Sequence, residues 1–243
     1  MDRVALVTGA SAGIGRAIAL KLLNSGYQVA VCARREALLQ EAFGAYGKQV
    51  LCLQVDLLQE AAIVGMFETI ADRWGGVDVI VNNAGAGRRA PLLDGDTADW
   101  QLMLSLNVLA LSVCTREAVR QMRVRGTAGH VVHVSSMAAH RVLAGSGMYS
   151  ATKHAVRALT EGLRGELRDI GSAIRVTSIS PGLVETEFAR NYNHGSDAAA
   201  KAVYGQHKVL EATDIADLVH YVLAAPAHVQ FHDILVRPTE QAG

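Results

Sequence analysis

A tyrosine and a lysine four positions apart, Tyr149 and Lys153, have the types and the spacing of a proton-transfer pair. If the segment is helical, the two side chains lie one turn apart on a single face and can interact. A free tyrosine titrates near pH ~10, and a neighbouring positive charge favours the phenolate, so we expect the pair to exchange a proton nearer neutral pH. Interconversion of a carbonyl and an alcohol needs such an acid and base.

Two adjacent serines, Ser135 and Ser136, precede this pair at an interval suited to a strand-end hydroxyl that meets a tyrosine on a helix. Because successive strand residues face opposite ways, only one of the two can point at a substrate. The tyrosine–lysine spacing alone also occurs by chance in many helices. The functional interpretation therefore depends on its combination with the serines and with the opening of the chain.

The chain opens with a glycine pattern between a predicted strand and a predicted helix, in the order Thr8-Gly9-x-x-x-Gly13-x-Gly15. Glycines let the backbone turn sharply and approach a pyrophosphate, whose negative charge is favoured at the amino end of a helix. The position after a strand is the context that a dinucleotide fingerprint requires. We expect cofactor contacts from Gly9, Ser11, Gly13, Ile14 and Gly15.

The second predicted strand ends in Ala33, Arg34 and Arg35. An acidic side chain at this strand end would bind the ribose 2′-hydroxyl of NAD and repel a 2′-phosphate. Ala33 stands where that acid is expected, and the forked donors of the two arginines suit a phosphate. The sequence therefore predicts NADP (NADPH) as the cofactor. The alternative, that the arginines merely begin a solvated helix, stays open.

Other strand ends supply further candidates for the cofactor site. Asp56, followed by Leu57, can accept from an adenine amino group, but a helix-capping role is an equal alternative. The small residues of the turn after the fourth strand allow a close approach, and backbone groups after the sixth strand can meet a nicotinamide carboxamide. These candidates are Asn83, Ala84 and Gly85, then Pro181, Gly182, Val184 and Thr186.

Short apolar runs alternate with helical patterns along the whole chain, which is typical of an α/β fold with helices on both faces of a parallel sheet. We predict one Rossmann-type, doubly wound domain over residues 1–243. About seven strands are expected, at Val4–Val7, Gln28–Cys32, Val50–Val55, Val77–Val81, His130–Ser135, Arg175–Ile179 and Ile234–Val236. Prominent helices are expected at Gly13–Asn24, Trp100–Arg125 and Tyr149–Arg168.

The segment 183–207 interrupts this alternation after Pro181 and Gly182. Ligands of open α/β sheets bind beyond the carboxyl ends of the strands. We therefore predict that the segment is a lid over the substrate, with a plain surface excursion as the alternative.

The amino-acid composition limits which binding partners and which cellular compartment we expect. Lys plus Arg number 23, equal to Asp plus Glu, and this balance argues against nucleic acid or an anionic membrane as a partner. The cysteines Cys32, Cys52 and Cys114 lie in apolar runs, so we expect small buried side chains, no disulfide framework and no metal site. A strand begins almost at once, and the apolar run from Leu102 to Cys114 contains polar residues. We therefore expect neither a leader nor a membrane span, and a cytoplasmic protein.

With these residues in view, the chain resembles the short-chain dehydrogenase/reductase family. The matching motifs run in order through Thr8 to Gly15, Asn82 to Gly85, Asn107, Ser136, Tyr149, Lys153 and Pro181-Gly182. The closing stretch, Ala225–Val229 and Ile234–Gln241, is similar to the NADP-dependent subgroup of serine and 3-hydroxy acid dehydrogenases and clavulanate-type aldehyde reductases.

The resemblance implies a role for each motif residue. Tyr149 would exchange the proton with the substrate oxygen, and Ser136, which the motif favours over Ser135, would hydrogen-bond that oxygen. Lys153 would hold the nicotinamide ribose and depress the pKa of the tyrosine, while Asn107 would help to seat a water that connects Lys153 to solvent. The family also implies a homo-oligomer, with a tetramer expected first and a dimer second.

Substrate contacts are expected from the residues between the serine and the tyrosine and from the lid. They are Met137, His140, Arg141, Phe188 and Arg190, of which the cations suit a small anionic substrate such as a hydroxy acid.

Three functions stay open. The first is reduction or oxidation of a small polar carbonyl or alcohol. The second is reduction of a 3-oxoacyl thioester, with an acyl-carrier partner at Arg88, Arg89 and Arg123–Arg125. The third is a non-catalytic NADP sensor, which would have no need of a paired tyrosine and lysine.

Overall fold

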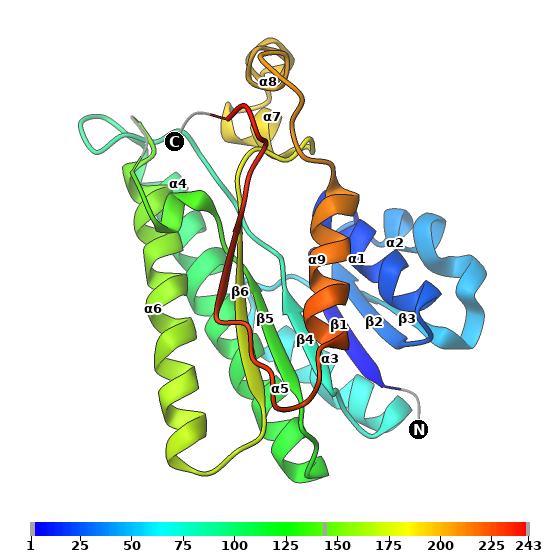
Figure 1. The fold of residues 1–243 in the computed structure, drawn as a ribbon. Coiled ribbons are helices and arrows are strands. Elements are labelled where there is room, and N and C mark those ends of the chain that lie inside the picture. The colour runs from blue at the N-terminus through cyan, green and yellow to red at the C-terminus, as the bar shows by residue number, and fades with distance from the viewer. Residues whose placement is uncertain (1–2, 143–144, 242–243) are drawn as a thin grey trace.

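The computed structural model describes residues 3–142 and 145–241. Its centre is a seven-stranded parallel sheet in the order β3-β2-β1-β4-β5-β6-β7, which confirms the predicted α/β fold class (Figure 1). The strands are β1 (Val4–Thr8), β2 (Gln28–Ala33), β3 (Val50–Gln54), β4 (Val79–Asn82), β5 (His130–Val134), β6 (Arg175–Pro181) and β7 (Asp233–Val236). Each lies within two residues of the predicted bounds.

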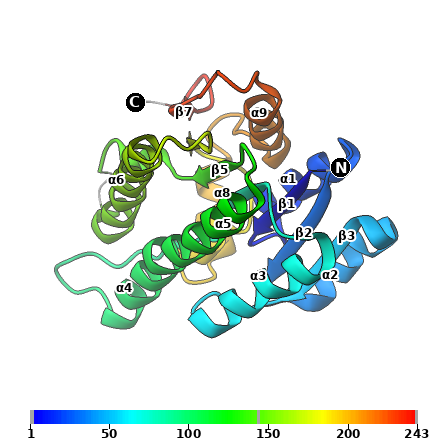
Figure 2. The same ribbon diagram turned by 90° about the horizontal axis from the view of Figure 1, so that it is seen from below.

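Apolar side chains alternate between the two faces of the sheet, so each face receives its own layer of helices. In β1, Ala5 and Val7 pack toward α1 (Gly13–Asn24) and α9 (Ala212–Ala224). Val4 and Leu6 pack on the opposite side, toward α3 (Glu60–Trp74) and α5 (Leu111–Arg125). Figure 2 shows α1 and α9 on one side of the strands and α3 and α5 on the other. All four of these side chains are essentially excluded from solvent, as a doubly wound sheet requires.

The remaining elements complete the two helical layers and cover the top of the sheet. They are α2 (Glu36–Phe43), η1 (Gly44–Gln49), α4 (Thr97–Leu104), η2 (Ser105–Ala110), η3 (Met137–Ala139), α6 (Gly147–Asp169), α7 (Phe188–Tyr192) and α8 (Asp197–Tyr204). The two short helices α7 and α8 lie above the carboxyl ends of the strands (Figure 1). They belong to the segment predicted to be a lid.

The helix predicted at Trp100–Arg125 consists of α4, a π-helical turn (η2) and α5 in succession. It begins earlier than predicted because the Asp96 carboxylate accepts the Ala98 N–H at 2.8 Å as an N-cap. Gly126, with φ of 64°, ends it in the left-handed conformation. Among the described residues, Thr97–Arg125 is long and apolar enough to cross a membrane by length and composition alone. This helix packs on α3, α6 and the sheet, and core helices pass the same test, so it is weak evidence for a membrane span.

The cysteines differ in burial. Cys32 and Cys114 are buried as expected, whereas Cys52 is only partly buried. The reason is that Cys52 lies in β3, the edge strand of the sheet, which helices and a neighbouring strand cover less completely.

The carboxyl ends of β1 and β4 are joined side by side. The Thr8 hydroxyl oxygen accepts the N–H groups of Asn83 and Ala84, both at 3.0 Å, and the Asn83 side-chain amide donates to the Thr8 carbonyl at 2.9 Å. The backbone after β1 must therefore pass close to the turn after β4. A Cβ at Gly9 would lie 2.8 Å from Ala84 Cα, and one at Gly15 would lie 2.5 Å from the Gly9 carbonyl oxygen.

We predict that Gly15→Ala destabilises the protein by about 1–3 kcal/mol, because the new methyl group has no room between Asn83 and Gly9. Gly162→Ala is the matched control. A Cβ at Gly162, in α6, would meet nothing within 4 Å, so this change should stabilise by about 0.5–1 kcal/mol. Urea unfolding of both variants measures the difference, and wild-type stability of Gly15→Ala would contradict the packing argument.

Candidate active site

A cavity of about 510 Å³ lies at the carboxyl ends of β1, β4, β5 and β6, and the segment 183–207, called the lid after the prediction for it, contributes to its lining. Glycine turns, catalytic candidates and lid residues all contribute to its lining. The residues that concern the predicted site are Gly9, Ser11, Gly13, Ile14, Arg35, Asn83, Gly85, Ser136, Met137, Arg141, Tyr149, Lys153, Pro181, Gly182, Val184, Thr186 and Phe188. The structure thus brings most of the predicted site residues to one cavity at the expected edge of the sheet.

Helix α6 carries Tyr149 and Lys153 on one face, as the spacing predicted. The Lys153 ammonium lies 5.9 Å from the centre of the tyrosine ring and donates to the Val134 carbonyl at 3.1 Å. The Ser136 side chain lies close enough to the Tyr149 hydroxyl to lower its pKa. A phenol, an ammonium and a hydroxyl therefore converge at the cavity.

Burial shifts the pKa values of Tyr149 and Lys153 away from their usual values. Burial raises the pKa of Tyr149 to about 12. The nearby Ser136 side chain lowers this pKa but does not offset the effect of burial. Burial also lowers the pKa of Lys153 to about 8. The pKa of Tyr149 is thus raised in this structure, in contrast to the expected depression by Lys153, because loss of water around the phenolate is the largest influence on it. At neutral pH Tyr149 is a phenol, the form that donates a proton.

The two serines have different environments. Ser136 is the N-cap of η3, and its hydroxyl oxygen accepts the Ala138 N–H at 3.1 Å beside its contact with Tyr149. The Ser135 backbone N–H continues the sheet pairing to the Ile179 carbonyl at 2.7 Å. The Ser135 hydroxyl is buried without a hydrogen-bond partner among the residues described. Of the two, Ser136 is the serine next to the tyrosine.

Asn107 lies in the π-helical turn η2 and does not line the cavity directly. Its side-chain oxygen accepts the Ala86 N–H at 2.7 Å, and its amide donates to the Ala86 carbonyl at 2.7 Å and to Thr152 Oγ1 at 3.0 Å. The side chain therefore clamps the turn that contains Gly85 against helix α6. This clamp is a positioning contact, and the predicted water-seating role stays a prediction.

The amino end of α1 fits an anionic ligand. The helix begins at Gly13 after Ala12, no side chain of the described residues caps it, and its first turn contains no acidic residue. Its first backbone N–H groups are therefore available to an anion, as in dinucleotide sites. Gly9 (φ 68°) and Gly13 (φ 54°) adopt backbone conformations that side chains disfavour, which explains the glycine pattern.

Only one of the two predicted arginines reaches the cavity. Arg35 lines it, and its guanidinium donates to Ser11 Oγ from NH2 at 3.1 Å and contacts the Glu187 carboxylate. Arg34 is exposed, does not line the cavity, and its carbonyl accepts from the Gln54 amide at 3.2 Å. The phosphate-binding expectation is thus supported geometrically by Arg35, whereas Arg34 stays a prediction.

Four other predicted cofactor residues lie outside the lining of this cavity. Asp56 Oδ1 accepts the Leu58 N–H at 3.1 Å in a local turn before α3, which corresponds to the capping alternative. Leu57 and Ala84 pack behind the site against the α5 layer. Gly15 is a packing residue, since its Cα faces Gly9 and Asn83.

The loop after β6 is held by contacts to the end of the chain. The Gly182 N–H donates to the Val236 carbonyl at 2.7 Å, and the Leu183 N–H donates to the Gln241 side-chain oxygen at 2.9 Å. Val184 forms an isolated bridge with Leu210. These contacts fix the predicted segment from Pro181 to Thr186 along the cavity.

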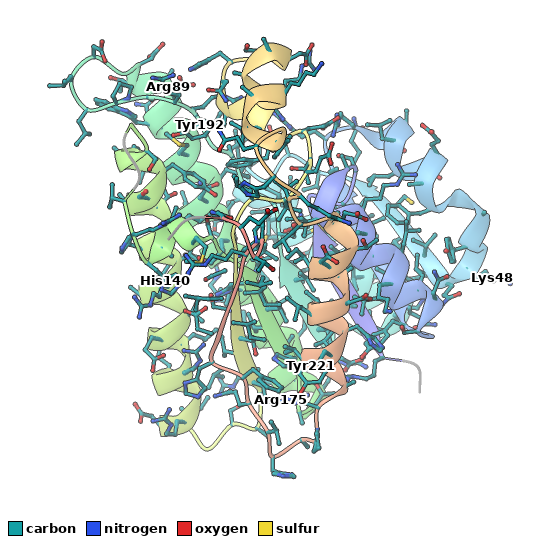
Figure 3. The ribbon with its side chains drawn as sticks, turned by 45° about the horizontal axis from the view of Figure 1, so that its top comes forward. Lys48, Arg89, His140, Arg175, Tyr192 and Tyr221 are labelled. Atoms are coloured by element: carbon teal, nitrogen blue, oxygen red, sulfur yellow. The ribbon has the colours of Figure 1, made fainter. Side chains whose placement is uncertain are left out.

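The predicted substrate residues separate into two groups. Met137, Arg141 and Phe188 line the cavity, whereas His140 and Arg190 do not. His140, labelled in Figure 3, contacts Ser180 Oγ at 3.1 Å and Asp233 at 3.3 Å, since it follows η3 toward β6 and β7. Arg190 pairs with Asp197 at 2.8 Å on the outside of the lid. The prediction that these two cations bind a substrate anion therefore has no support in the geometry.

Aromatic side chains from the segment predicted to be a lid pack near the Tyr149 ring. The ring centres of Phe188 and Tyr192 lie 5.5 and 6.1 Å from that of Tyr149. The lid is also tied to the loop after β4, because the Arg89 N–H donates to the Tyr192 carbonyl at 2.9 Å and Arg88 donates to the Asn191 carbonyl at 2.9 Å. Arg89 and Tyr192 appear at the top of Figure 3, where the lid meets this loop.

Several residues at the cavity were missed by the sequence reasoning. Among them are Glu187, Tyr192, Tyr204 and Gln241. Phe188 and Tyr192 share the i, i+4 spacing of one helical face, so this spacing in a predicted lid could have indicated Tyr192. Gln241 carries no such signal, because its contact with Leu183 joins segments 58 residues apart.

Comparisons with known proteins agree on one family. A family model described as short chain dehydrogenase matches residues 3–197. Human dehydrogenase/reductase SDR family member 11 is 48% identical over 99% of this chain and 95% of its own. Farnesol dehydrogenase of Aedes aegypti is 40% identical over 98% of each chain. The closed form of a serine dehydrogenase complexed with NADP+ has a TM-score of 0.94 at 34% identity, over 99% of this chain and 96% of that one.

We predict that Lys153→Met stabilises the protein at pH 7. The Lys153 pKa falls from 10.5 to about 8 on folding, which corresponds to a penalty on the order of 3 kcal/mol for the buried ammonium. Loss of its hydrogen bond to Val134 offsets part of this, so a net gain of about 1–2 kcal/mol is expected. The measurement is denaturant unfolding, with the exposed Lys48→Met as the control.

The pH dependence of this gain has a definite sign. Between pH 8 and 10.5 the unfolded wild type binds more protons at this lysine than the folded one, so wild-type stability rises with pH. The advantage of Lys153→Met should therefore be complete below pH 8 and shrink as the pH rises above it. An advantage independent of pH would contradict the buried-ammonium explanation.

Proposed function

This chain belongs to the short-chain dehydrogenase/reductase family of oxidoreductases, and from that membership we propose that it transfers a hydride between NADP and a small carbonyl or alcohol. The observation that carries the proposal is the convergence of Tyr149, Ser136 and Lys153 in one cavity with the glycine turn of α1. An acid, a hydrogen-bond donor and a cation beside a dinucleotide cradle are the parts that this reaction needs.

In the proposed reaction, bound nicotinamide supplies or accepts the hydride. Tyr149, protonated at neutral pH, gives its hydroxyl proton to the carbonyl oxygen during reduction and recovers it during oxidation. The Ser136 hydroxyl donates a hydrogen bond to the same oxygen and stabilises its developing negative charge. The Lys153 ammonium stabilises the phenolate that remains after proton transfer, and Asn107 keeps the neighbouring turn in place.

The preference for NADP is supported by three observations. Arg35 lies at the cavity beside Ser11, Ala33 stands in place of an acid at the end of β2, and the superposed serine dehydrogenase is complexed with NADP+. Arg34 is not needed for the proposal. A guanidinium that donates from several nitrogens is suited to a phosphate.

The cavity gives limited information about the substrate. Among the cations predicted to bind a substrate anion, Arg141 alone lines it, while Phe188, Tyr192 and Met137 form an apolar wall next to Tyr149. We propose a substrate whose reacting oxygen meets Tyr149 and whose body packs on these rings. A hydroxy acid or related aldehyde fits this arrangement if Arg141 meets its carboxylate.

The two alternative functions receive less support. Arg123–Arg125 end helix α5 near Asp78, at the edge of the sheet opposite to the cavity, and Arg88 is occupied by the lid, so an acyl-carrier patch would be small. A non-catalytic sensor would leave the Tyr149, Ser136 and Lys153 cluster without a purpose. Both remain outcomes of a substrate screen.

We also propose a cytoplasmic homo-oligomer, with a tetramer expected first. Support for assembly comes from apolar side chains exposed along the α4–α5 helix, namely Leu104, Leu109 and Val124. Exposed apolar residues along one helix are typical of surfaces that another copy covers. The free cysteines are consistent with a reducing compartment.

We predict that Tyr149→Phe binds NADPH normally but loses turnover by roughly 10²–10⁴-fold, because the variant keeps the ring and lacks the proton. NADPH consumption is followed with a panel of aldehydes, 3-oxo acids, acyl thioesters and bicyclic ketones. Tyr221→Phe, in the exposed part of α9, is the control that loses the same hydroxyl away from the cavity. Unchanged turnover in Tyr149→Phe would refute the proposed mechanism.

The cofactor preference gives a separate prediction. NADPH should bind at least about tenfold more tightly than NADH, a difference of about 1.4 kcal/mol that a charge-assisted contact of Arg35 can supply. Fluorescence titration of the purified protein with each cofactor measures both dissociation constants. Equal affinities would remove the NADP assignment.

A further inference from the structure

The Arg35 side chain is engaged by an acidic residue from the lid. Glu187 lies directly before α7, and its two carboxylate oxygens accept from Arg35 NH1 at 3.3 Å and NH2 at 2.9 Å. Ser11 Oγ accepts from Nε at 3.4 Å and from NH2 at 3.1 Å. Every nitrogen of the guanidinium thus has a partner, and 152 residues separate Arg35 from Glu187.

The bidentate contact with Glu187 uses the same Arg35 N–H donors that would bind a phosphate. A carboxylate and a phosphate both bind a guanidinium through two parallel N–H···O bonds. Glu187 is ionised in this contact, since the hydrogen bonds from Arg35 hold the pKa of its carboxyl below the usual value. Both side chains are about half exposed, at 48% and 52%, so the pair can separate at moderate cost.

Other charges near this pair do not replace Glu187. Arg190 adds a weaker positive field on Glu187 but is itself paired with Asp197. Arg34 lies outside the cavity lining, and Ala33 leaves the end of β2 without an acid. Glu187 therefore brings to the cofactor cavity, from the lid, the acidic group that the strand end lacks.

We infer that Glu187 is a specificity-determining residue that reduces the preference for NADP over NAD, by holding the Arg35 guanidinium that the 2′-phosphate needs. The inference rests on the proposed use of NADP. A 2′-phosphate must displace the carboxylate from Arg35, whereas a cofactor with a free 2′-hydroxyl leaves the pair intact. Glu187 thus weakens NADPH binding and has little effect on NADH binding.

The test is equilibrium fluorescence titration of Glu187→Gln with NADPH and with NADH. We expect the dissociation constant for NADPH to fall by about three- to fivefold, the scale of one exposed ion pair, and that for NADH to change less than about twofold. Glu185→Gln, an exposed acid of the same loop outside the cavity lining, is the matched control and should change neither. An unchanged ratio of the two constants in Glu187→Gln would overturn the inference.

A double-mutant cycle identifies the partner of Glu187. In an Arg35→Gln background, Glu187→Gln should improve NADPH binding less than about twofold, because no guanidinium is left to release. An equal gain in both backgrounds would overturn the inference in favour of a general charge effect. Failure of the wild type to bind NADPH more tightly than NADH would instead refute the proposed cofactor, so the two failures are distinguishable.

Discussion

The close joining of two neighbouring strand ends is the constraint on which the site depends. Because the sheet is parallel, β1 and β4 end at the same edge, and hydrogen bonds of Thr8 and Asn83 join these ends. This joining leaves no room for side chains at Gly9 and Gly15. The amino end of α1 is thereby aimed at the space above β4, and the cavity opens there.

Helix α6 is held against the sheet by buried polar groups as well as apolar ones. His133 in β5 contacts Thr160 of α6 through Nδ1 at 2.8 Å and Thr115 of α5 through Nε2 at 3.1 Å. The Thr160 hydroxyl already donates to the Val156 carbonyl, so its oxygen accepts from His133, which places the proton on Nδ1. Burial lowers the pKa of His133 to about 3. A neutral imidazole adds no positive charge near Lys153, which this arrangement keeps in position.

Local patterns made the fold and the centre of the site predictable. The strands alternate with amphipathic helices, and the motifs around Gly9, Ser136, Tyr149 and Pro181 each lie within a few residues, so their geometry follows from one strand end or one helical turn. The predictions that the cavity geometry leaves without support concern side chains whose direction depends on distant partners. His140 turns to Asp233, and Arg190 turns to Asp197. Neither carboxylate could be assigned to its cation from spacing.

The charge state of Tyr149 shows why a correct motif can still give a wrong pKa. The i, i+4 spacing established that Lys153 is near, and proximity alone favours the phenolate. The structure adds the rings of Phe188 and Tyr192, which pack near the Tyr149 ring. Desolvation then becomes the largest influence on the pKa. The pKa of the tyrosine therefore depends on burial by side chains from other segments, among them rings about 40 residues away, and such packing has no signature in the helix that carries the motif.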